Sequence, residues 1–278
     1  MQKAYVVAKI ETKTALVTGA SGGIGLTTAL ALRKAGYRVF GTSRRAEPSA
    51  EPGITMLQCD VTDDASVAGV VESVLAQTGR IDVLVNNAGF GIAGGAEESS
   101  IEQARMLFEV NVFGLIRMVR AVLPAMRAQG RGRIVNISSV FGFMPAPYMA
   151  LYAATKHAVE GYSESLDHEV RVFGVRVVLI EPANTATAFD KNLARADQPL
   201  EPYAGARSDN EVLMGEMMKT GDAPETIAAA IVAAAEAKTP KRRYAPGSAR
   251  QLSLARRFAP SGVFDKSLRK QMRLPRAS

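Results

Sequence analysis

The feature that most constrains the fold is a glycine-rich turn near the N-terminus, over residues 19–25 (GASGGIG). The apolar run 14–18 before it predicts a buried strand of a parallel sheet, and residues 26–34 predict the helix after it. Glycine lets the backbone turn tightly and approach a ligand, while a helix N-terminus offers free N–H groups to an anion. The pattern predicts a strand, turn and helix that hold a pyrophosphate; the alternative is the same turn without a ligand.

The alternation of apolar runs and helical patterns continues to residue 245. Further strands are expected over residues 37–42, 54–59, 81–85, 133–137, 175–180 and 243–245. Further helices are expected over residues 63–77, 101–129, 151–173 and 224–237, with Pro124 as the point where the second of these shortens or kinks. This order predicts an α/β fold, a doubly wound parallel sheet (Rossmann-like) in a single domain with a helical C-terminal extension. We place the boundary between residues 1–247 and 248–278.

The charge of the chain is concentrated in its tail. The net charge is +7, and residues 238–278 contain twelve Lys or Arg but one acid, Asp265. The remainder is therefore acidic overall, which is not the pattern of a nucleic-acid-binding domain. We expect no nucleic-acid partner.

Composition also bounds the location and the metal content. Cys59 is the only cysteine, which excludes an internal disulfide and is typical of a reducing compartment. No apolar run approaches the ~20 residues that span a bilayer, and the start lacks a long apolar signal core. We expect a soluble cytoplasmic protein. His157 and His168 are interpreted as structural, and no His/Cys/Asp cluster has metal-ligand spacing, so no catalytic metal is expected.

A second motif places a tyrosine and a lysine on one face of a helix, at Tyr152 and Lys156. A phenol in water has a pKa of roughly 10, and a nearby ammonium lowers that pKa by favouring the phenolate. The pair predicts a proton donor that works near pH 7. This spacing is common by chance, so its company matters: Ser139 follows the strand 133–137, and Asn111 lies in Asn-Val-Phe-Gly.

Together with the sequence 86–89 (NNAG) after the fourth strand, these motifs resemble the short-chain dehydrogenase/reductase family over roughly residues 13–245. The resemblance implies that Tyr152 exchanges a proton with the oxygen of a carbonyl or alcohol, and that Ser139 hydrogen-bonds this oxygen. It implies that Lys156 lowers the tyrosine pKa and binds the nicotinamide ribose, and that Asn111 supports a water chain to solvent. The nicotinamide exchanges the hydride.

The same resemblance implies the cofactor contacts. The turn spacing G-x-x-x-G-x-G is the variant that the family uses, and the matching aspartate after the third strand contacts the adenine. Ala183 stands where the family usually has glycine. The implied cofactor-binding residues outside the second strand are Gly19, Ser21, Gly23, Ile24, Gly25, Asp60, Val61, Asn87, Ala88, Gly89, Tyr152, Lys156, Pro182, Thr185 and Thr187.

The end of the second strand distinguishes the two nicotinamide cofactors. An acid there would bind the ribose hydroxyls of NAD, but the chain has Ser43, Arg44 and Arg45. A guanidinium pairs well with a 2′-phosphate, so Arg44 favours NADP (NADPH) and makes NAD less favoured. The alternative is a pair of solvated turn arginines.

The substrate is predicted to be a small apolar carbonyl compound or alcohol. The loop 140–149 is apolar and aromatic and leads to Tyr152, so we interpret it as a pocket wall; the alternative is a loop packed into the core. Residues 188–222 carry three methionines and suit a flexible lid over an apolar ligand. Arg243-Tyr244 and the sequence 264–266 (FDK) in an extended C-terminus are similar to the steroid- and retinol-active branch of the family.

Two kinds of partner are expected from the rest of the chain. Family members commonly form homodimers or homotetramers through two long helices, which match residues 101–129 and 151–173. In the tail, Pro260 and Gly262 interrupt the mixed apolar and basic pattern, which predicts two short helices packed on the body. Peripheral contact with an anionic membrane is the secondary possibility. Two other functions stay open: a non-catalytic NADP-binding regulator, and a membrane-surface or polyanion binder that acts through the tail.

Overall fold

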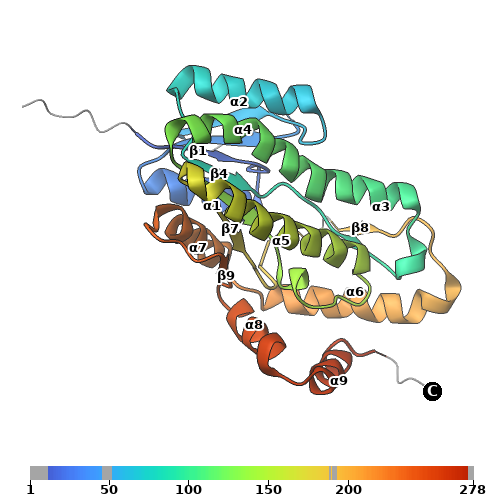
Figure 1. Ribbon diagram of the computed structural model, residues 1–278. Coiled ribbons are helices and arrows are strands. Elements are labelled where there is room, and N and C mark those ends of the chain that lie inside the picture. The colour runs from blue at the N-terminus through green and yellow to red at the C-terminus, as the bar shows by residue number, and fades with distance from the viewer. Residues whose placement is uncertain (1–11, 46–51, 188, 190–192, 275–278) are drawn as a thin grey trace, which may run out of the picture.

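The computed structural model describes residues 12–45, 52–187, 189 and 193–274 (Figure 1). Its centre is a seven-stranded sheet in the order β3-β2-β1-β4-β6-β7-β9, in which every neighbouring pair is parallel. The strands are β1 (Thr14–Val17), β2 (Arg38–Ser43), β3 (Ile54–Gln58), β4 (Val83–Asn86), β6 (Gly132–Ile137), β7 (Val175–Ile180) and β9 (Arg243–Tyr244). The chain runs outward from β1 to β3, returns beside β1, and runs outward again to β9. The predicted doubly wound parallel sheet is confirmed.

Helices cover both faces of this sheet. One face packs against α1 (Gly23–Lys34) and α7 (Pro224–Glu236). The opposite face packs against α2 (Asp64–Thr78), α4 (Leu115–Gln129) and α5 (Ala150–Val170), as Figure 1 shows. The result is a layered α/β domain whose strands are buried on both sides.

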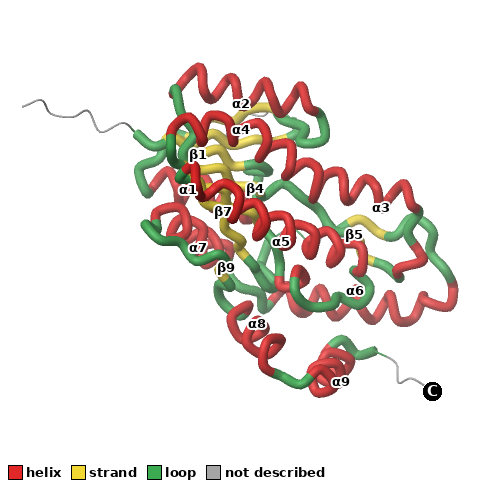
Figure 2. Tube along the Cα trace, in the orientation of Figure 1, coloured by secondary structure: helices red, strands yellow, loops and turns green. Residues whose placement is uncertain are grey.

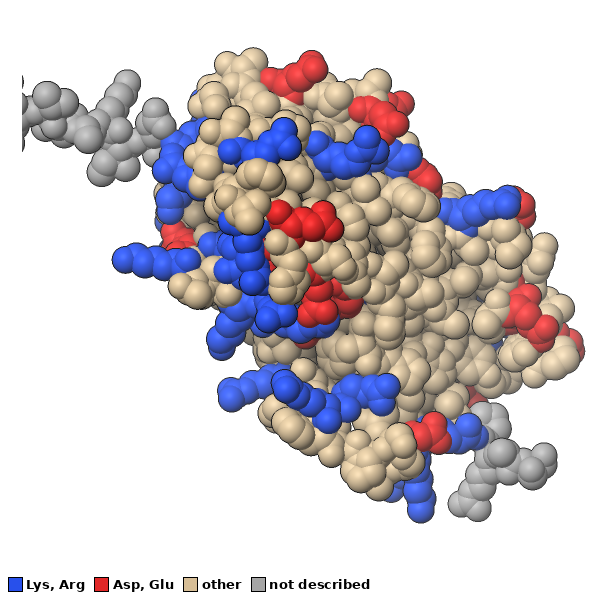
Figure 3. All heavy atoms as spheres, viewed as in Figure 1, with Lys and Arg blue, Asp and Glu red and all other residues tan. Residues whose placement is uncertain are grey.

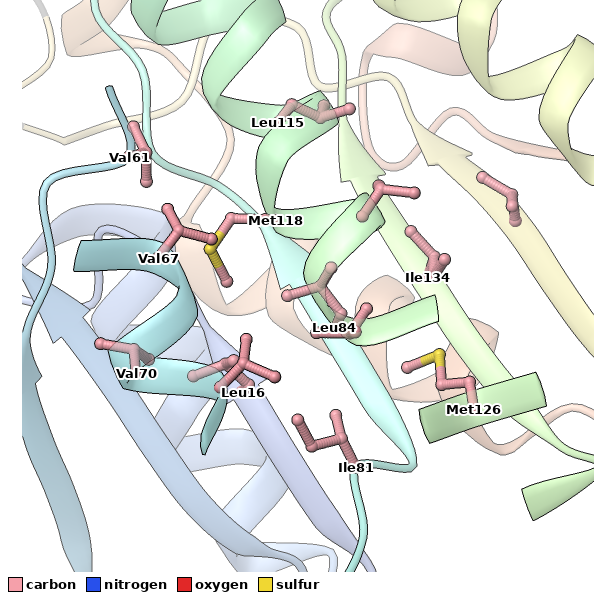
Figure 4. Packing of buried hydrophobic residues seen from close by; sticks show 14 of the residues in the cluster. Leu16, Val61, Val67, Val70, Ile81, Leu84, Leu115, Met118, Met126 and Ile134 are labelled. Carbon is pink, nitrogen blue, oxygen red and sulfur yellow. The ribbon is translucent and has the colours of Figure 1, made fainter. Parts of the chain in front are cut away.

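The burial explains why the strands read as continuous apolar runs. Side chains alternate between the two faces of a strand, so Ala15 and Val17 join the cluster under α1 and α7, while Leu16 joins the other. Figure 4 shows Leu16 beside Leu84 of the neighbouring strand and Val70 of α2. Neither face of the sheet is exposed to solvent, so neither requires polar side chains.

The long helix expected over residues 101–129 is interrupted, but not at Pro124. It consists of α3 (Ile101–Phe108), a π-helical turn over Glu109–Gly114, and α4. Pro124 is exposed inside α4, where water can satisfy the backbone group that a proline leaves unpaired. A π-turn inside a helix often marks a functional site, and this one contains Asn111.

The flexible segment expected over residues 188–222 has more regular structure than its sequence indicates. Its described part contains β8 (Ala194–Arg195), a 3₁₀ turn over Glu201–Tyr203, and α6 (Ala204–Lys219). Strand β8 pairs with β5 (Ile92–Ala93) in a small second sheet. Further 3₁₀ turns lie at Ala96–Glu98, Val140–Gly142 and Arg171–Phe173.

The tail forms two short helices, α8 (Ala249–Phe258) and α9 (Ser261–Gln271). They extend from the body beside α6 and are joined by a sharp bend (Figure 2). The bend falls at Ala259 and Pro260, whereas Gly262 lies inside α9 and does not break it. Within the described part of the chain, no helix is long and apolar enough to span a membrane.

Candidate active site

The predicted site residues follow the carboxyl ends of the strands. Gly19 follows β1, Asn87 follows β4, Ser139 follows β6 and Pro182 follows β7. Because parallel strands end at the same edge of a sheet, these loops gather along one edge. Helix α5, which carries Tyr152 and Lys156, follows the loop that bears Ser139.

The N-terminus of α1 fits an anion. Gly22 provides no side-chain cap and the first turn has no acid, whereas α2 and α3 are capped by Asp63 and Ser100. A Cβ at Gly22 would meet nothing within 4 Å, so the space beside this residue is open. Because a helix N-terminus favours negative charge, these residues fit a pyrophosphate.

The rest of this turn is shaped by close packing. A Cβ at Gly25 would lie 2.2 Å from the carbonyl oxygen of Gly19, so no larger residue fits there. A Cβ at Gly23 would lie 3.6 Å from Thr187, which places Thr187 beside the turn. Ser21 is exposed and Ile24 is half-buried at the helix start.

The residues after β4 hold two loops together. The Asn87 Nδ2 donates to the carbonyl oxygens of Thr18 (3.0 Å) and Gly19 (3.1 Å). The Thr18 hydroxyl accepts from the backbone N–H groups of Asn87 (2.9 Å) and Ala88 (3.0 Å). Asn87 therefore fixes the glycine-rich turn against β4. Thr18 shares this task, and sequence reasoning missed it because a threonine that ends a strand carries no distinctive signal.

The ends of β2 and β3 lie side by side. Arg44 is exposed, and its carbonyl oxygen accepts from Gln58 Nε2 at 3.2 Å. The Asp60 Oδ1 accepts from the N–H (2.9 Å) and hydroxyl (2.8 Å) of Thr62; these bonds, and then the charge of Arg44, lower the Asp60 pKa. Val61 is buried, and a Cβ at Gly114 would lie 2.7 Å from it. The Asp60 carboxylate and the Arg44 guanidinium are thus close enough to interact at the ends of β3 and β2.

Tyr152 is buried among apolar side chains. Its ring is edge-on to Phe141 at 6.4 Å and tilted against Phe189 at 5.8 Å between ring centroids. The loop 140–149 contributes Phe141 at this position, while its Met144 and Met149 are buried, so part of the loop is packed into the core. Phe189 belongs to the predicted lid segment and was not singled out from the sequence. The buried residues clustered with Tyr152 are Ile92, Leu107, Ala146, Met149, Ala153 and Met214.

The pKa expected for Tyr152 is wrong for this structure. Burial raises the Tyr152 pKa above its usual value, and a hydrogen bond with Ser139 opposes the rise. The Lys156 Nζ lies 5.5 Å from the ring centroid but donates to the carbonyl oxygen of Ile137 at 2.9 Å. Burial also lowers the Lys156 pKa to about 8, against the charge of Glu160. Desolvation of both groups outweighs the attraction on which the expectation rested.

Asn111 is fixed by the π-turn. Its Oδ1 accepts from the N–H of Phe90 at 3.0 Å, and its Nδ2 donates to the Phe90 carbonyl oxygen at 2.9 Å and the Thr155 hydroxyl at 3.2 Å. The Thr155 hydroxyl donates to the carbonyl oxygen of Tyr152 at 2.7 Å. A Cβ at Gly89 would lie 3.0 Å from Asn111 Oδ1. Asn111 thus joins the loop after β4 to the helix that carries Tyr152.

The segment after β7 tolerates alanine at position 183. The non-glycine residues with positive φ in the described chain are Tyr148 and Arg273, so the Ala183 backbone has no need of glycine. Thr185 is buried and bridges to Asp222. The carbonyl oxygen of Pro182 accepts from the N–H of Val140 at 2.9 Å. This segment therefore packs against the loop that bears Ser139.

A buried charge cluster lies behind Lys156. Glu160 follows Lys156 by one helical turn and is 4% exposed, and burial raises its pKa to about 7. Arg243 of β9 pairs with Glu160, with Glu181 at 2.5 Å and with Glu164 at 3.0 Å. Sequence reasoning placed Arg243 in the last strand without its partners. The spacing of Glu160 from Lys156 was the one available signal.

A second buried carboxylate attaches α6 to the body. Glu98 is fully buried and accepts from the N–H groups of Gly95 (2.6 Å) and Leu200 (2.8 Å), and it pairs with Arg207 of α6. Burial alone would raise the Glu98 pKa, but these bonds and the charge of Arg207 hold it below its usual value. Beside it, the Ser100 hydroxyl donates to Asp197 at 2.6 Å. Leu200, Arg207 and Asp197 of the predicted lid segment are thus attached to the body through Glu98 and Ser100.

No group of three His, Cys, Asp or Glu side chains in the described ranges is placed to hold a metal ion. The described residues instead include a glycine-rich turn at an uncapped helix N-terminus, an exposed guanidinium, and a buried phenol next to a hydroxyl and an ammonium. These residues could hold a dinucleotide and an apolar molecule with one reactive oxygen.

Comparison with known proteins agrees with this geometry. Residues 13–198 match the family model for short chain dehydrogenase. The chain is 39% identical over 259 residues to a 3-ketodihydrosphingosine reductase of Bacteroides thetaiotaomicron, covering 91% of this chain and 96% of the relative. It is 32% identical over 273 residues to retinol dehydrogenase 8 of Bos taurus, covering 90% and 86%.

Solved structures with the same fold include relatives with bound cofactor. A short-chain dehydrogenase from Streptomyces avermitilis has a TM-score of 0.78 at 34% identity, covering 96% of this chain and 97% of that one. ElxO with NADP bound has a TM-score of 0.70 at 30% identity, covering 82% and 93%. A 3-ketoacyl-(acyl-carrier-protein) reductase from Brucella melitensis complexed with NADH has 0.68 at 27% identity, covering 81% and 91%. The chain therefore belongs to the short-chain dehydrogenase/reductase family of oxidoreductases.

Proposed function

We propose that the protein is an NADP(H)-dependent oxidoreductase that interconverts an apolar carbonyl compound and its alcohol, with Tyr152 as the acid and base. The observation that carries this proposal is the setting of Tyr152. Its phenol is buried among apolar side chains, hydrogen-bonded with Ser139, and close to the Lys156 ammonium.

The cofactor-binding residues support a nicotinamide dinucleotide with a 2′-phosphate. The first turn of α1 and the adjoining Thr187 would hold the pyrophosphate, and Arg44 would pair with the 2′-phosphate. Asp60 would lie at the adenine, as the family resemblance implies. When bound, the nicotinamide supplies or accepts the hydride. The relatives with NADP and NADH bound support the general class, and Arg44 is the reason to prefer NADP.

The chain's own residues would handle the proton. Because burial raises the Tyr152 pKa, the phenol keeps its proton at neutral pH, which is the form that donates to a carbonyl oxygen. Ser139 would hydrogen-bond the same oxygen as charge develops on it. The Lys156 ammonium would stabilise the phenolate left after the transfer. In the reverse direction the phenolate takes the proton from an alcohol.

The substrate class follows from the apolar surroundings of Tyr152. Phe141, Phe189 and the Met149 side chain offer no charge for a polar substrate. The relatives named as acting on a ketodihydrosphingosine and a retinol are in keeping with a long apolar substrate. The test is NADPH oxidation across apolar ketones and aldehydes, and NADP reduction across apolar secondary alcohols. Cofactor binding without turnover across this panel would favour the non-catalytic regulator instead.

Replacing Arg44 by aspartate should narrow or reverse the preference for NADPH over NADH. A hydrogen bond to a charged group contributes about 1.5–3 kcal/mol, so the loss in NADPH affinity is about tenfold to a hundredfold. Titration calorimetry with each cofactor measures it. Lys34→Asp makes the same charge change at the other end of α1 and should leave the preference unaltered. Equal affinities of the wild type for both cofactors contradict the assignment of Arg44.

A homodimer or homotetramer is expected through the surface of α3, the π-turn and α5. Ile101, Met106 and Phe113 are 63%, 54% and 49% exposed on this surface. Ile101 and Phe113 line a groove that also includes Ala104, Arg105, Phe108 and Glu109. Light scattering at micromolar concentration should give a multiple of the 29.6 kDa chain mass, and Phe113→Glu should shift it toward the monomer. A monomer mass for the wild type contradicts this assembly.

A further inference from the structure

The two tail helices each have an inner face that packs on the body. Ala249 of α8 and Leu268 of α9 are buried, and Met272 follows on the same side. Arg256 also points inward, because its Nε donates to the carbonyl oxygen of Phe143 at 3.2 Å and its guanidinium lies 5.0 Å from the Phe264 ring. The tail is therefore a docked part of the structure with a defined orientation.

The opposite, outer faces carry large apolar side chains in contact with solvent. Leu254 is 50% exposed, Phe258 is 73% exposed and Val263 is 61% exposed. Leu254 and Phe258 are one helical turn apart, while Phe258 and Val263 stand on either side of the bend at Pro260. The three form an apolar corner where the two helices meet.

Basic side chains accompany this corner on the same helix faces. Arg250 precedes Leu254 by one turn of α8, and the Arg257 guanidinium lies 5.5 Å from the Phe258 ring. Lys266 and Lys270 follow Val263 along α9 at helical spacing. All four are exposed. Figure 3 shows Lys and Arg groups around the uncharged surface of the tail, with an acidic group among them at its lower end. The one acid within α9 is the exposed Asp265.

We propose that this corner, made of Leu254, Phe258 and Val263 with the four basic residues around it, docks on an anionic lipid bilayer. Apolar side chains that enter the boundary between headgroups and acyl chains, combined with a cationic surround that meets the lipid phosphates, are the two elements of interfacial binding. A second copy of the chain fits less well, because a two-fold contact would bring the basic groups of both copies together. A nucleic acid would leave the exposed apolar corner unexplained.

The inner contacts connect this surface to the site. The same helices pack against Val140, Met144 and Phe143 of the pocket loop, and against Leu213 of α6. The tail helices would therefore lie between a bilayer on their outer face and the pocket loop and α6 on their inner face. The proposed docking does not depend on the proposed function.

The test is co-sedimentation of the full chain with vesicles of phosphatidylcholine alone and of phosphatidylcholine mixed with phosphatidylglycerol. We expect the wild type to pellet with the mixed vesicles, and the triple variant Leu254→Gln/Phe258→Gln/Val263→Gln to lose at least tenfold in partitioning. The control is Val172→Gln/Val212→Gln, which removes two other exposed apolar residues, 81% and 56% accessible, and should bind like the wild type.

A second variant separates the electrostatic part. Arg250→Gln/Arg257→Gln/Lys266→Gln/Lys270→Gln should bind mixed vesicles no better than neutral ones, and added salt should do the same to the wild type. Melting temperatures should stay unchanged, because all altered side chains are exposed. Wild-type protein that stays in the supernatant, or a triple variant that pellets as well as the wild type, overturns the proposal. No step of this test uses turnover, so an inactive enzyme would not affect its outcome.

Discussion

Replacing Tyr152 by phenylalanine should lower turnover by about a hundredfold to ten-thousandfold, the range expected for loss of a general acid. The substitution keeps the ring between Phe141 and Phe189 and removes only the hydroxyl, so the fold should persist. NADPH affinity should remain near that of the wild type, because the phenol oxygen is one contact among many. Steady-state NADPH oxidation and calorimetry measure the two quantities separately.

The matched control is Tyr148→Phe, four residues before Tyr152 in the loop that precedes α5. Tyr148 is half-buried with a φ of 60°, and its carbonyl oxygen accepts from the N–H of Gly94 at 2.9 Å, a bond that phenylalanine keeps. This variant should retain most of the activity. A Tyr152→Phe enzyme that turns over near the wild-type rate would show that the proton comes from another group.

Replacing Arg243 by methionine should destabilise the protein by about 3 kcal/mol. Removing one partner of a buried ion pair costs about 3–5 kcal/mol because it leaves a buried charge uncompensated. Arg243 contacts Glu160 and Glu181, which are almost fully buried, but its own side chain is 37% exposed, so the lower end applies. Urea denaturation measures the free energy of unfolding, and Arg242→Met, an exposed neighbour, should change it little.

The stability lost in the Arg243→Met variant should be larger at high pH than at low pH. Burial raises the Glu160 pKa to about 7 in the folded protein, above the roughly 4.3 of an unfolded glutamate. Between these values the folded state binds more protons than the unfolded state, so this group's contribution to stability falls as pH rises. Without Arg243 the carboxylates resist ionisation more strongly, so the variant should lose more stability at pH 8 than at pH 5. An equal loss at pH 5 and pH 8 would contradict the raised pKa of Glu160, because it would mean that the ionisation of this carboxyl does not change between the two pH values.

The sheet was predictable because its signals are local. Residues 14–18 and 175–180 read as buried strands since each is apolar on both faces, and the glycines at 19–25 mark a turn wherever the chain goes afterwards. The relative placement of Ser139, Tyr152 and Lys156 followed from the family resemblance, which transfers a three-dimensional arrangement onto a linear spacing.

The charged contacts were not predictable for the opposite reason. Glu160 meets Arg243, and Glu98 meets Arg207, only after the sheet and helices have assembled. The predicted lowering of the Tyr152 pKa was wrong for the same reason. The spacing of Tyr152 from Lys156 can be read from the sequence. The burial that raises the Tyr152 pKa involves Phe141 and Phe189, which lie in other segments of the chain.

The π-turn in the long helix shows a third kind of failure. Because proline interrupts helices, the sequence predicts that the helix shortens or kinks at Pro124. The change of helical type occurs instead around Asn111, whose amide bonds both backbone groups of Phe90. This contact with Phe90 joins two separate segments, so no periodicity in the sequence of the helix indicates it.

The position of Arg243 has a consequence for how the chain matures on the ribosome. Glu160, Glu164 and Glu181 emerge first, and the guanidinium that neutralises them comes from the last strand of the sheet. A nascent chain that ends before this strand contains the carboxylates of Glu160 and Glu164 in α5 and of Glu181 after β7 without their cation. The domain therefore reaches its native charge balance only when nearly all of it has been synthesised.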